Sequence, residues 1–297
     1  MDQAGEAFGG HTHAETGARL AHHLETGGRL LAFGGPYSNL QSVLALRDTA
    51  SRLGVPADAV ICTGDIVAYC GEPNETCAAI RDWGCLAIAG NCEEQLAIRS
   101  STCGCGFTDG STCDALSRGW YQFADQALDD DHRRWMSGLP RTIGFSALGL
   151  RWAVIHGGYR QTSQFVFPST PAAVKAEDMV AAEADVIIAG HAGIPFLEPI
   201  GPRGLWINAG VIGMPANDGT REGWYAMIEH TREGLAVATH RLGFDWQTAA
   251  ARAERSAPAY AQALRCGLWP SLDVLPEAEK SAAGLARSTE RIVLPHR

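Results

Sequence analysis

The sequence predicts an α/β protein in which much of the strand pairing is parallel. Strand-like apolar runs recur through most of the chain, and each of them closes on Gly, Asn, Asp or His or just before such a residue. Helix-like stretches separate the early runs, with Asn or Pro at their starts and Gly just past their ends. Alternating strands and helices are typical of βαβ crossovers, which pair strands in parallel.

The expected strands are short apolar runs bounded by turn-forming residues. In chain order they cover residues 29–33, 59–65, 85–91, 150–156, 184–191 and 205–208. Residues 39–53 and 73–83 are the expected helices between the first three strands. Residues 204–241 hold three strand-like runs with short connections, which predicts antiparallel additions or a second sheet. Ligands of open α/β sheets gather at strand carboxyl ends, so the polar residues there indicate a site.

Composition divides the chain into three parts. Residues 1–28 are polar, without the apolar region of a signal peptide, and predict a flexible tail. Residues 29–245 predict one α/β domain with a cysteine-containing insertion at about 99–115. Residues 246–297 predict a C-terminal helical extension in which Trp269 is a packing anchor rather than a binding residue. The tail histidines are interpreted as coincidental or exposed, and they are His11, His13, His22 and His23.

Overall composition argues against several functions. The 297 residues are 46% hydrophobic, enough for a full core, and the formal net charge is -9. The chain has no Lys/Arg-rich run that would suit duplex nucleic acid. No apolar run approaches the roughly 18 residues of a membrane span. We therefore expect a cytoplasmic protein that acts on a small substrate, with a homo-oligomer left open.

Four residues at the ends of predicted strands form a compatible metal-ligand set. Their types are one carboxylate, one amide oxygen and two imidazoles, and the residues are Asp65, Asn91, His156 and His191. Such a mixed set suits one Mn, Fe, Co or Zn ion better than Mg or Ca, which prefer oxygen ligands throughout. Taken singly, each residue also fits an ordinary turn or cap position.

Several motifs carry a resemblance to a known family. They are Gly64-Asp-Ile-Val-Ala-Tyr-Cys-Gly-Glu-Pro-Asn-Glu75, Gly90-Asn-Cys-Glu93, His156-Gly157, Gly190-His191, and Ile207-Asn-Ala-Gly-Val-Ile-Gly-Met-Pro215 followed by Arg221. In this order, residues 30–229 resemble the calcineurin-like metallophosphoesterase superfamily, especially its compact bacterial branch. The resemblance implies an α/β/β/α sandwich of two mixed sheets flanked by helices, with a dinuclear metal centre. It also implies that Asp65 bridges the metals while the other three ligands complete one of the two sites.

The chain departs from the family at one metal position. Gly35-Pro-Tyr37-Ser-Asn39 aligns with the opening D-x-H-G-N motif, and Gly190-His-Ala-Gly193 aligns with G-H-x-H. All three lost ligands belong to the same metal, which predicts a remodelled, mononuclear site. Tyr37 would bind a ferric ion, donate to a substrate oxygen, or pack. The small residues of the opening turn also suggest that an organic substrate or cofactor occupies the vacated metal space.

Candidate catalytic and substrate-binding residues surround the expected metal. Asp65, Tyr37, Cys92 and Glu93 are the catalytic candidates, with Cys92 as a ligand, a nucleophile or a buried thiol, and Glu93 orienting the loop or accepting a proton. The candidates for substrate binding are Arg221, Arg160, Asn39 and Tyr37.

The insertion carries a C-x-C pair and a third cysteine, Cys103, Cys105 and Cys113. These thiols could bind zinc or an iron–sulfur cluster with a fourth ligand such as Cys92, although the spacing matches no standard finger. Structural thiols or a redox-labile pair are the favoured interpretation.

Three functions follow from these observations. The first is a metal-dependent phosphoesterase that hydrolyses a phosphomonoester or phosphodiester with metal-activated water. The second is a noncatalytic regulatory module that keeps the fold and one ion. The third is an iron-dependent redox or lyase enzyme that uses Tyr37 and nearby cysteines.

Overall fold

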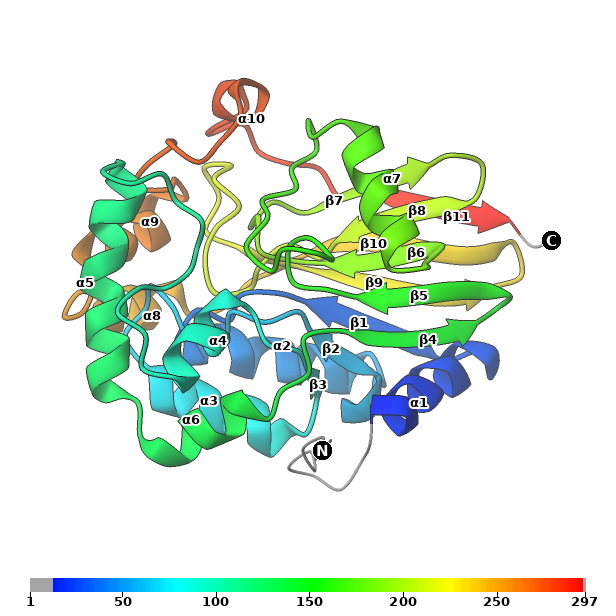
Figure 1. The fold of residues 1–297 in the computed structure, drawn as a ribbon, viewed down its shortest axis with the longest axis horizontal. Coiled ribbons are helices and arrows are strands. Elements are labelled where there is room, and N and C mark those ends of the chain that lie inside the picture. Colours follow the sequence, from blue (N-terminus) through cyan, green and yellow to red (C-terminus); the bar gives the residue numbers. More distant parts are fainter. Residues whose placement is uncertain (1–12, 296–297) are drawn as a thin grey trace.

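A computed structural model describes residues 13–295 as two facing sheets flanked by helices (Figure 1). The first sheet has the order β11-β10-β9-β1-β2-β3 and the second β4-β5-β6-β8-β7. The strands of the first sheet are β1 (Arg29–Phe33), β2 (Val60–Cys62), β3 (Leu86–Ala87), β9 (Gly223–Thr231), β10 (Gly234–Leu242) and β11 (Arg291–Pro295). Those of the second sheet are β4 (Ile143–Ala147), β5 (Leu150–Val154), β6 (Val186–Ala189), β7 (Phe196–Ile200) and β8 (Gly204–Asn208).

Both sheets are mixed, which confirms the predicted fold class. Strands β1, β2 and β3 pair in parallel, as do β5, β6 and β8. Strands β9 and β10 extend the first sheet by antiparallel pairing beside β1. The expected early helices are α2 (Leu40–Arg52) and α3 (Pro73–Trp83). The parallel strands therefore end at one edge of the sandwich, where the polar strand-end residues meet.

The remaining helices surround this framework. Helix α7 lies on the outer side of the second sheet, whereas α5, α8 and α9 lie together beyond one end of the sheets (Figure 1). Their bounds are α4 (Asn91–Ala97), α5 (Thr112–Ala127), α6 (Asp130–Ser137), α7 (Ala172–Ala181), α8 (Trp246–Ala253), α9 (Pro258–Cys266) and α10 (Glu277–Ser281), with a 3-10 turn at Ala57–Ala59. No helix of residues 13–295 is long and apolar enough to cross a membrane.

The expected flexible tail is wrong for residues 13–25, which form helix α1 (His13–Glu25) against β4. Leu20 and Leu24 lie four residues apart, on one face of the helix, and both are fully buried in the main core. His22 is exposed as expected, but His23 is half-buried and hydrogen-bonded to Asp58. His11 lies outside the described residues. The mean composition of residues 1–28 is polar, and for this reason the short apolar face of the helix was overlooked.

We expect Leu20→Ala to destabilise the protein by about 2 to 5 kcal/mol, because the change leaves a cavity in the main core. Urea unfolding followed by far-UV circular dichroism measures this difference. Glu25→Ala, at an exposed position of the same helix, is the matched control and should change the stability by less than about 0.5 kcal/mol. A Leu20→Ala protein as stable as the control would contradict the docking of α1.

The C-terminal extension is not purely helical. Helices α8, α9 and α10 are present, but β11 returns to the first sheet and pairs antiparallel with β10. Buried Asp218 anchors the extension to the core, since its carboxylate accepts hydrogen bonds from the Arg241 guanidinium and the Arg287 backbone amide. The extension is therefore part of the folded domain and positions its side chains near the edge where the strands end.

Candidate metal centre

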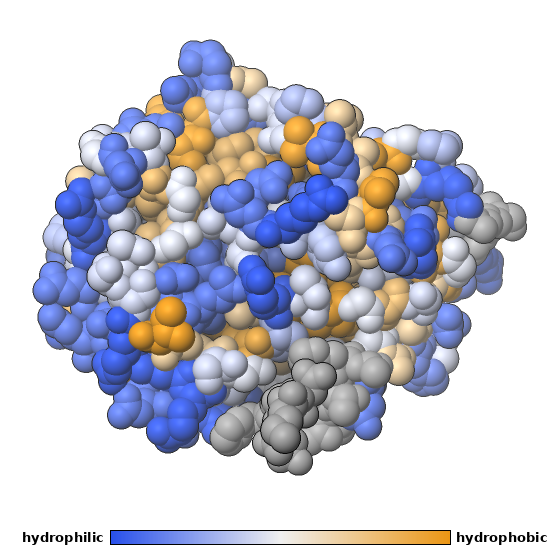
Figure 2. All heavy atoms as spheres, viewed as in Figure 1, coloured by the Kyte–Doolittle hydropathy of each residue, from blue (hydrophilic) through white to orange (hydrophobic). Residues whose placement is uncertain are grey.

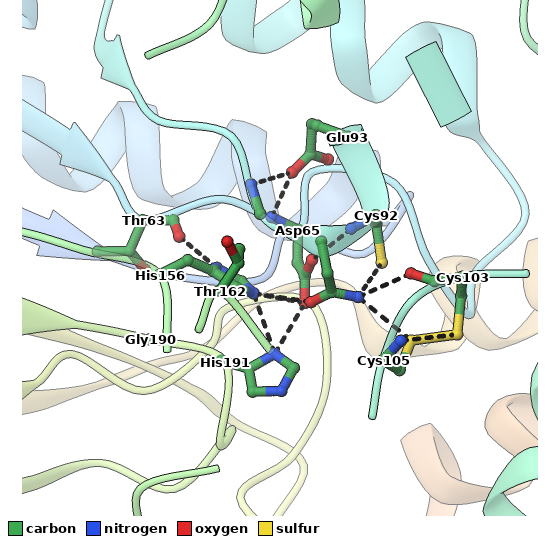
Figure 3. A network of polar contacts seen from close by, with 12 residues as sticks. Thr63, Asp65, Cys92, Glu93, Cys103, Cys105, His156, Thr162, Gly190 and His191 are labelled. Carbon is green, nitrogen blue, oxygen red and sulfur yellow. Dashed lines mark hydrogen bonds and ion pairs between the residues drawn. A yellow bond between two sulfur atoms is a disulfide. The ribbon is translucent and has the colours of Figure 1, made fainter. Parts of the chain in front are cut away.

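Four side chains from four strand ends meet at one point. Asp65 follows β2, Asn91 begins α4 just after β3, His156 follows β5, and His191 follows β6. All four are at least nine-tenths buried. Figure 3 shows Asp65, His156 and His191 pointing toward one another. The sequence-predicted ligand set is thus brought together in three dimensions.

Donor atoms of this group lie at distances suited to one metal ion. Nε2 of His156 is 3.1 Å from Oδ1 of Asn91, 3.0 Å from Nδ1 of His191 and 3.3 Å from Oδ2 of Asp65. Oδ2 of Asp65 and Nδ1 of His191 are 3.8 Å apart. Ligands with bonds of about 2.1 Å to a divalent ion are separated by roughly 3.0 to 3.4 Å in octahedral or tetrahedral geometry. The four residues therefore fit an ion of the Mn, Fe, Co or Zn class.

The backbone turns sharply at two of these residues. Asp65 has φ +57° and His191 has φ +59°, both in the left-handed region that L-residues rarely adopt. Each such conformation costs on the order of 1 to 3 kcal/mol and persists only where the surrounding structure enforces it. The turns direct both side chains into the centre at the end of their strands.

Neighbouring carbonyls orient two of the ligands. Nδ1 of His156 donates to the carbonyl of Thr63 at 2.6 Å, so the Nε2 lone pair faces the centre. The amide of Asn91 donates to the Cys103 carbonyl at 3.0 Å and to Cys105 Sγ at 3.4 Å, so Oδ1 points to the centre. Both residues present the correct atom for metal binding.

Burial and mutual charge govern the electrostatics of the centre. Burial alone would raise the pKa of Asp65, but the adjacent imidazoles of His156 and His191 hold it well below its usual range. Burial lowers the pKa of His191, and the nearby Asp65 only partly opposes this. For His156, Asp65 outweighs the burial and raises the pKa. In the absence of an ion, the ionised Asp65 carboxylate thus favours the protonated form of His156, whereas His191 stays neutral; a metal ion bound at Nε2 of His156 would displace that proton.

Glu93 organises the Asp65 loop rather than facing the centre. It is fully buried, and its carboxylate accepts hydrogen bonds from the backbone amides of four residues, Asp65 (2.7 Å), Ile66 (2.8 Å), Val67 (3.3 Å) and Gly90 (2.9 Å). Burial raises the pKa of Glu93 to about 7, and the Asp65 carboxylate acts in the same direction. Of the two roles expected for Glu93, these contacts support loop orientation.

Cys92 is a buried thiol behind the centre. Its backbone amide donates to Asp65 Oδ1 at 3.3 Å, and its sulfur accepts from the Asn91 amide at 3.6 Å. Burial raises the pKa of the thiol well above its ordinary value, which favours the buried-thiol alternative for Cys92.

Three of the expected substrate-binding residues make contacts within the fold, and their role in substrate binding stays a prediction. Asn39 caps α2 by accepting from the Ser42 amide, and its own amide donates to the Gly213 carbonyl. Arg221 lies over the Trp246 ring and donates to the Arg265 carbonyl, which ties the core to the extension. Arg160 is exposed, and its charge and backbone hydrogen bond partly oppose the rise that burial causes in the pKa of Asp178 of α7. The sequence motifs identified these three residues, but their contact partners depend on how distant segments pack.

Protein side chains, rather than open space, adjoin the positions of the lost ligands. A Cβ at Gly35 (φ +42°) would lie 2.5 Å from Tyr37 Cζ, and one at Gly193 (φ +71°) would lie 3.0 Å from Trp269 Cζ2. Tyr37 is buried, and its ring packs edge-on against Tyr69 with centroids 4.6 Å apart. Tyr37 and Trp269 therefore narrow the space beside the lost ligands, and the expectation of an organic substrate or cofactor there stays a prediction.

The insertion cysteines form a bonded pair and a separate thiol, as in the favoured interpretation, and the zinc or iron–sulfur alternative stays a prediction. Cys103 and Cys105 form a disulfide, and Cys113 is a separate, buried free thiol. Among residues 13–295, the group of His, Cys, Asp and Glu side chains spaced to hold an ion is Asp65, His156 and His191. The disulfide loop accepts two of the three hydrogen bonds that the Asn91 amide donates, at the Cys103 carbonyl and at Cys105 Sγ (Figure 3).

Replacing Cys105 by Ser is expected to weaken metal binding by about 10-fold, because the loop that orients Asn91 loses its cross-link. Competition with a chelator measures the metal affinity. Cys266→Ser, at a half-buried free thiol remote from Asn91, is the matched control and should bind metal like the wild type. Equal affinity of the two variants would show that the disulfide does not position Asn91.

Two contributors near the centre had no clear signal in the sequence. The Thr63 carbonyl orients His156, and a backbone acceptor leaves no mark on residue type. The Phe165 ring lies 4.3 Å from the His191 ring, centroid to centroid, although Phe165 sits in an irregular connection. Trp269 was expected only to pack, yet it lines a pocket together with His191.

Comparison with known proteins gives the family. Residues 41–233 match the family model of the calcineurin-like phosphoesterase superfamily domain. The chain belongs to this superfamily. The match begins after the altered Gly35-Pro-Tyr37-Ser-Asn39 segment, whereas all four candidate ligands lie within it.

Solved structures of this calcineurin-like fold are similar over most of the chain. A metallophosphoesterase from Sphaerobacter thermophilus is 20% identical, with a TM-score of 0.62, and the match covers 81% of this chain and 99% of that one. A hypothetical protein from Pyrococcus horikoshii, PH1004, is 14% identical, with a TM-score of 0.67 and the same coverage. These likenesses confirm the fold.

A relative of uncharacterised function is found by sequence. The protein MJ0912 of Methanocaldococcus jannaschii is 24% identical over 163 residues, which is 54% of this chain. The matched segment spans 60% of the length of that relative.

The family match and the buried site point to the same general chemistry. The calcineurin-like domain, with its buried Asp, Asn and two His side chains, supports metal-dependent phosphoester chemistry in general.

Proposed function

We propose that the protein is a phosphoesterase that hydrolyses a small phosphomonoester or phosphodiester at a site with one divalent ion. The observation that carries this proposal is the buried convergence of Asp65, Asn91, His156 and His191, with donor atoms 3.0 to 3.8 Å apart. The loss of three family ligands at Gly35, Tyr37 and Gly193 argues for one ion rather than two.

Each residue of the centre has a role in holding the ion or in positioning its ligands. Asp65, Asn91, His156 and His191 would hold the ion, which when bound supplies a polarising charge for a phosphoryl oxygen and lowers the pKa of water. Glu93 keeps the Asp65 loop in its left-handed turn, and the Thr63 carbonyl keeps His156 in the right tautomer. The four ligands are buried, which strengthens the charge interactions among them.

The test measures metal content and turnover together. Protein loaded in turn with Mn, Fe, Co and Zn is assayed on one phosphomonoester and one phosphodiester, and the bound metal is counted by elemental analysis. We expect about one ion per chain and hydrolysis that a chelator abolishes. Two ions per chain would overturn the mononuclear site, and metal binding without turnover of either ester would overturn the enzyme.

One observation favours the noncatalytic module as a second candidate. Among the described residues, those that line the pocket beside the centre include no Lys or Arg to hold a phosphoryl group. The ion alone would then supply positive charge. Metal binding without turnover in the same experiment is the result that this candidate predicts.

The iron-dependent redox or lyase alternative gains no support from the contacts. Burial and the nearby Asp65 raise the pKa of Tyr37, which disfavours a phenolate. Two of the three insertion cysteines are joined in the disulfide.

A further inference from the structure

A pocket with mainly apolar walls opens directly beside the candidate metal centre. Its aromatic side chains come from five distant segments, and they are Tyr37, Tyr69, Phe107, Phe165, Tyr260 and Trp269. We call the space between them the aromatic pocket; its cavity volume is about 70 Å³. Hydrophobic side chains also gather below α10 on the face shown in Figure 2.

The walls are rigid because their rings pack on one another. Tyr69 lies between two rings, with centroid distances of 4.6 Å to Tyr37 and 4.5 Å to Tyr260. Phe165 stacks on Phe107 at 6.0 Å and lies 4.3 Å from His191. These separations are those of favourable aromatic pairs, so the side chains hold the pocket open without a ligand.

His191 belongs to both the metal centre and the aromatic pocket. Its Nδ1 faces Asp65, and the opposite edge of the ring points away from the other ligands (Figure 3). Nε2 on that edge is buried and has no hydrogen-bond partner of ordinary geometry. The Ser163 carbonyl lies near enough to raise the pKa of the ring, although burial lowers it more. When Nδ1 binds a metal, the proton of the neutral ring sits on Nε2. A ligand oxygen in the pocket would satisfy this donor.

The C-terminal extension completes the pocket. Trp269 is held in place because its indole Nε1 donates to the Pro215 carbonyl at 2.7 Å and its backbone amide donates to Asn217 Oδ1 at 2.8 Å. Its ring lies against Gly193, where the family motif that this chain resembles has a third histidine. An aromatic wall therefore stands where a second metal ion would have had a ligand.

We infer that the aromatic pocket receives part of a planar aromatic group carried by the phosphoester substrate, with the phosphoryl group directed to the metal centre; its volume of about 70 Å³ is smaller than the roughly 150 Å³ of an enclosed benzene-binding cavity, so the rest of the ring lies outside. This inference rests on the proposed function. The pocket has six aromatic side chains and no Lys or Arg among its described lining residues, and it adjoins the ligand His191; this lining favours a flat apolar ring over a charged group. Burial of a phenyl group favours its binding at least about tenfold over a methyl group.

The test compares two non-hydrolysable probes on the metal-loaded, full-length protein. Isothermal titration calorimetry measures the Kd of phenylphosphonate and of methylphosphonate. We expect phenylphosphonate to bind at least about tenfold more tightly. Equal affinities would overturn the inference.

A filling variant locates the preference. Leu116 lines the aromatic pocket from a half-buried position on α5, so Leu116→Trp should fill the space, keep the fold and reduce the preference for phenyl to about twofold or less. Leu44→Trp, at an exposed position of α2 outside the pocket, is the matched control and should keep the preference. An unchanged preference in Leu116→Trp would also overturn the inference.

A third probe separates this inference from the proposed function. If neither phosphonate binds, the phosphoryl site fails, and titration with phenol, followed by tryptophan fluorescence, examines the aromatic pocket alone. Saturable phenol binding that Leu116→Trp removes would support the pocket as an aromatic site. No saturable binding to the wild type would overturn it.

Discussion

The His156→Ala protein is expected to bind its divalent ion more than about 100-fold more weakly than the wild type and to lose metal-dependent phosphoester hydrolysis. His156 Nε2 lies within 3.3 Å of a donor atom of each of the other three ligands, so it stands at the middle of the set. Loss of a residue that only supports a ligand already costs 10- to 100-fold in affinity, and loss of a ligand costs more. Competition with a chelator and elemental analysis measure the binding.

Two further variants make this result specific. Asp65→Asn preserves the shape of the side chain while removing its charge, and it should lose the ion with little change in fold. His240→Ala, which removes a half-buried imidazole that stacks on Tyr225 far along β10, is the matched control and should retain the ion. Full metal content in both His156→Ala and Asp65→Asn would place the ion elsewhere.

Replacing Glu93 by Ala is expected to destabilise the protein by at least about 3 kcal/mol and to weaken metal binding. The change leaves four backbone amides of the Asp65 and Gly90 turns without an acceptor in a buried site. Each unsatisfied buried donor costs about 1 to 3 kcal/mol, and the costs are not additive. Urea unfolding of the metal-free protein measures the loss, which is large against a total stability of about 5 to 15 kcal/mol.

The neighbouring glutamate offers a matched control. Glu94 pairs with Arg141 at 2.7 Å, and the Arg141 side chain is largely exposed, so Glu94→Ala should cost less than about 1 kcal/mol. Glu93→Gln keeps one carbonyl acceptor but places an amide group among donors, and an intermediate loss is expected. If the Glu93 and Glu94 variants were equally stable, the carboxylate of Glu93 would not hold the loop.

Much of the fold could be predicted because its signals are local. The apolar run of β1 and the helix pattern of α3, with Gly84 in the left-handed region after its last residue, are visible in consecutive residues. The N-terminal helix was missed because Leu20 and Leu24 are the two large apolar residues of an otherwise polar helix. Their burial stabilises the helix only when it packs on β4. Strand β11 was missed for the same reason, since its partner β10 lies far away in sequence.

The ligands of the candidate centre could also be predicted from local signals, but the side chains around them could not. Asp65, Asn91, His156 and His191 could be predicted from the sequence alone, because parallel strands carry their last residues to one edge of a sheet, and the ordered motifs of the family mark those residues. Which side chains surround that edge depends on contacts between distant segments. Only the tertiary structure assigned Arg221 to Trp246, placed Trp269 against Gly193 and joined the disulfide loop to Asn91, because packing, hydrogen bonds and burial choose those partners.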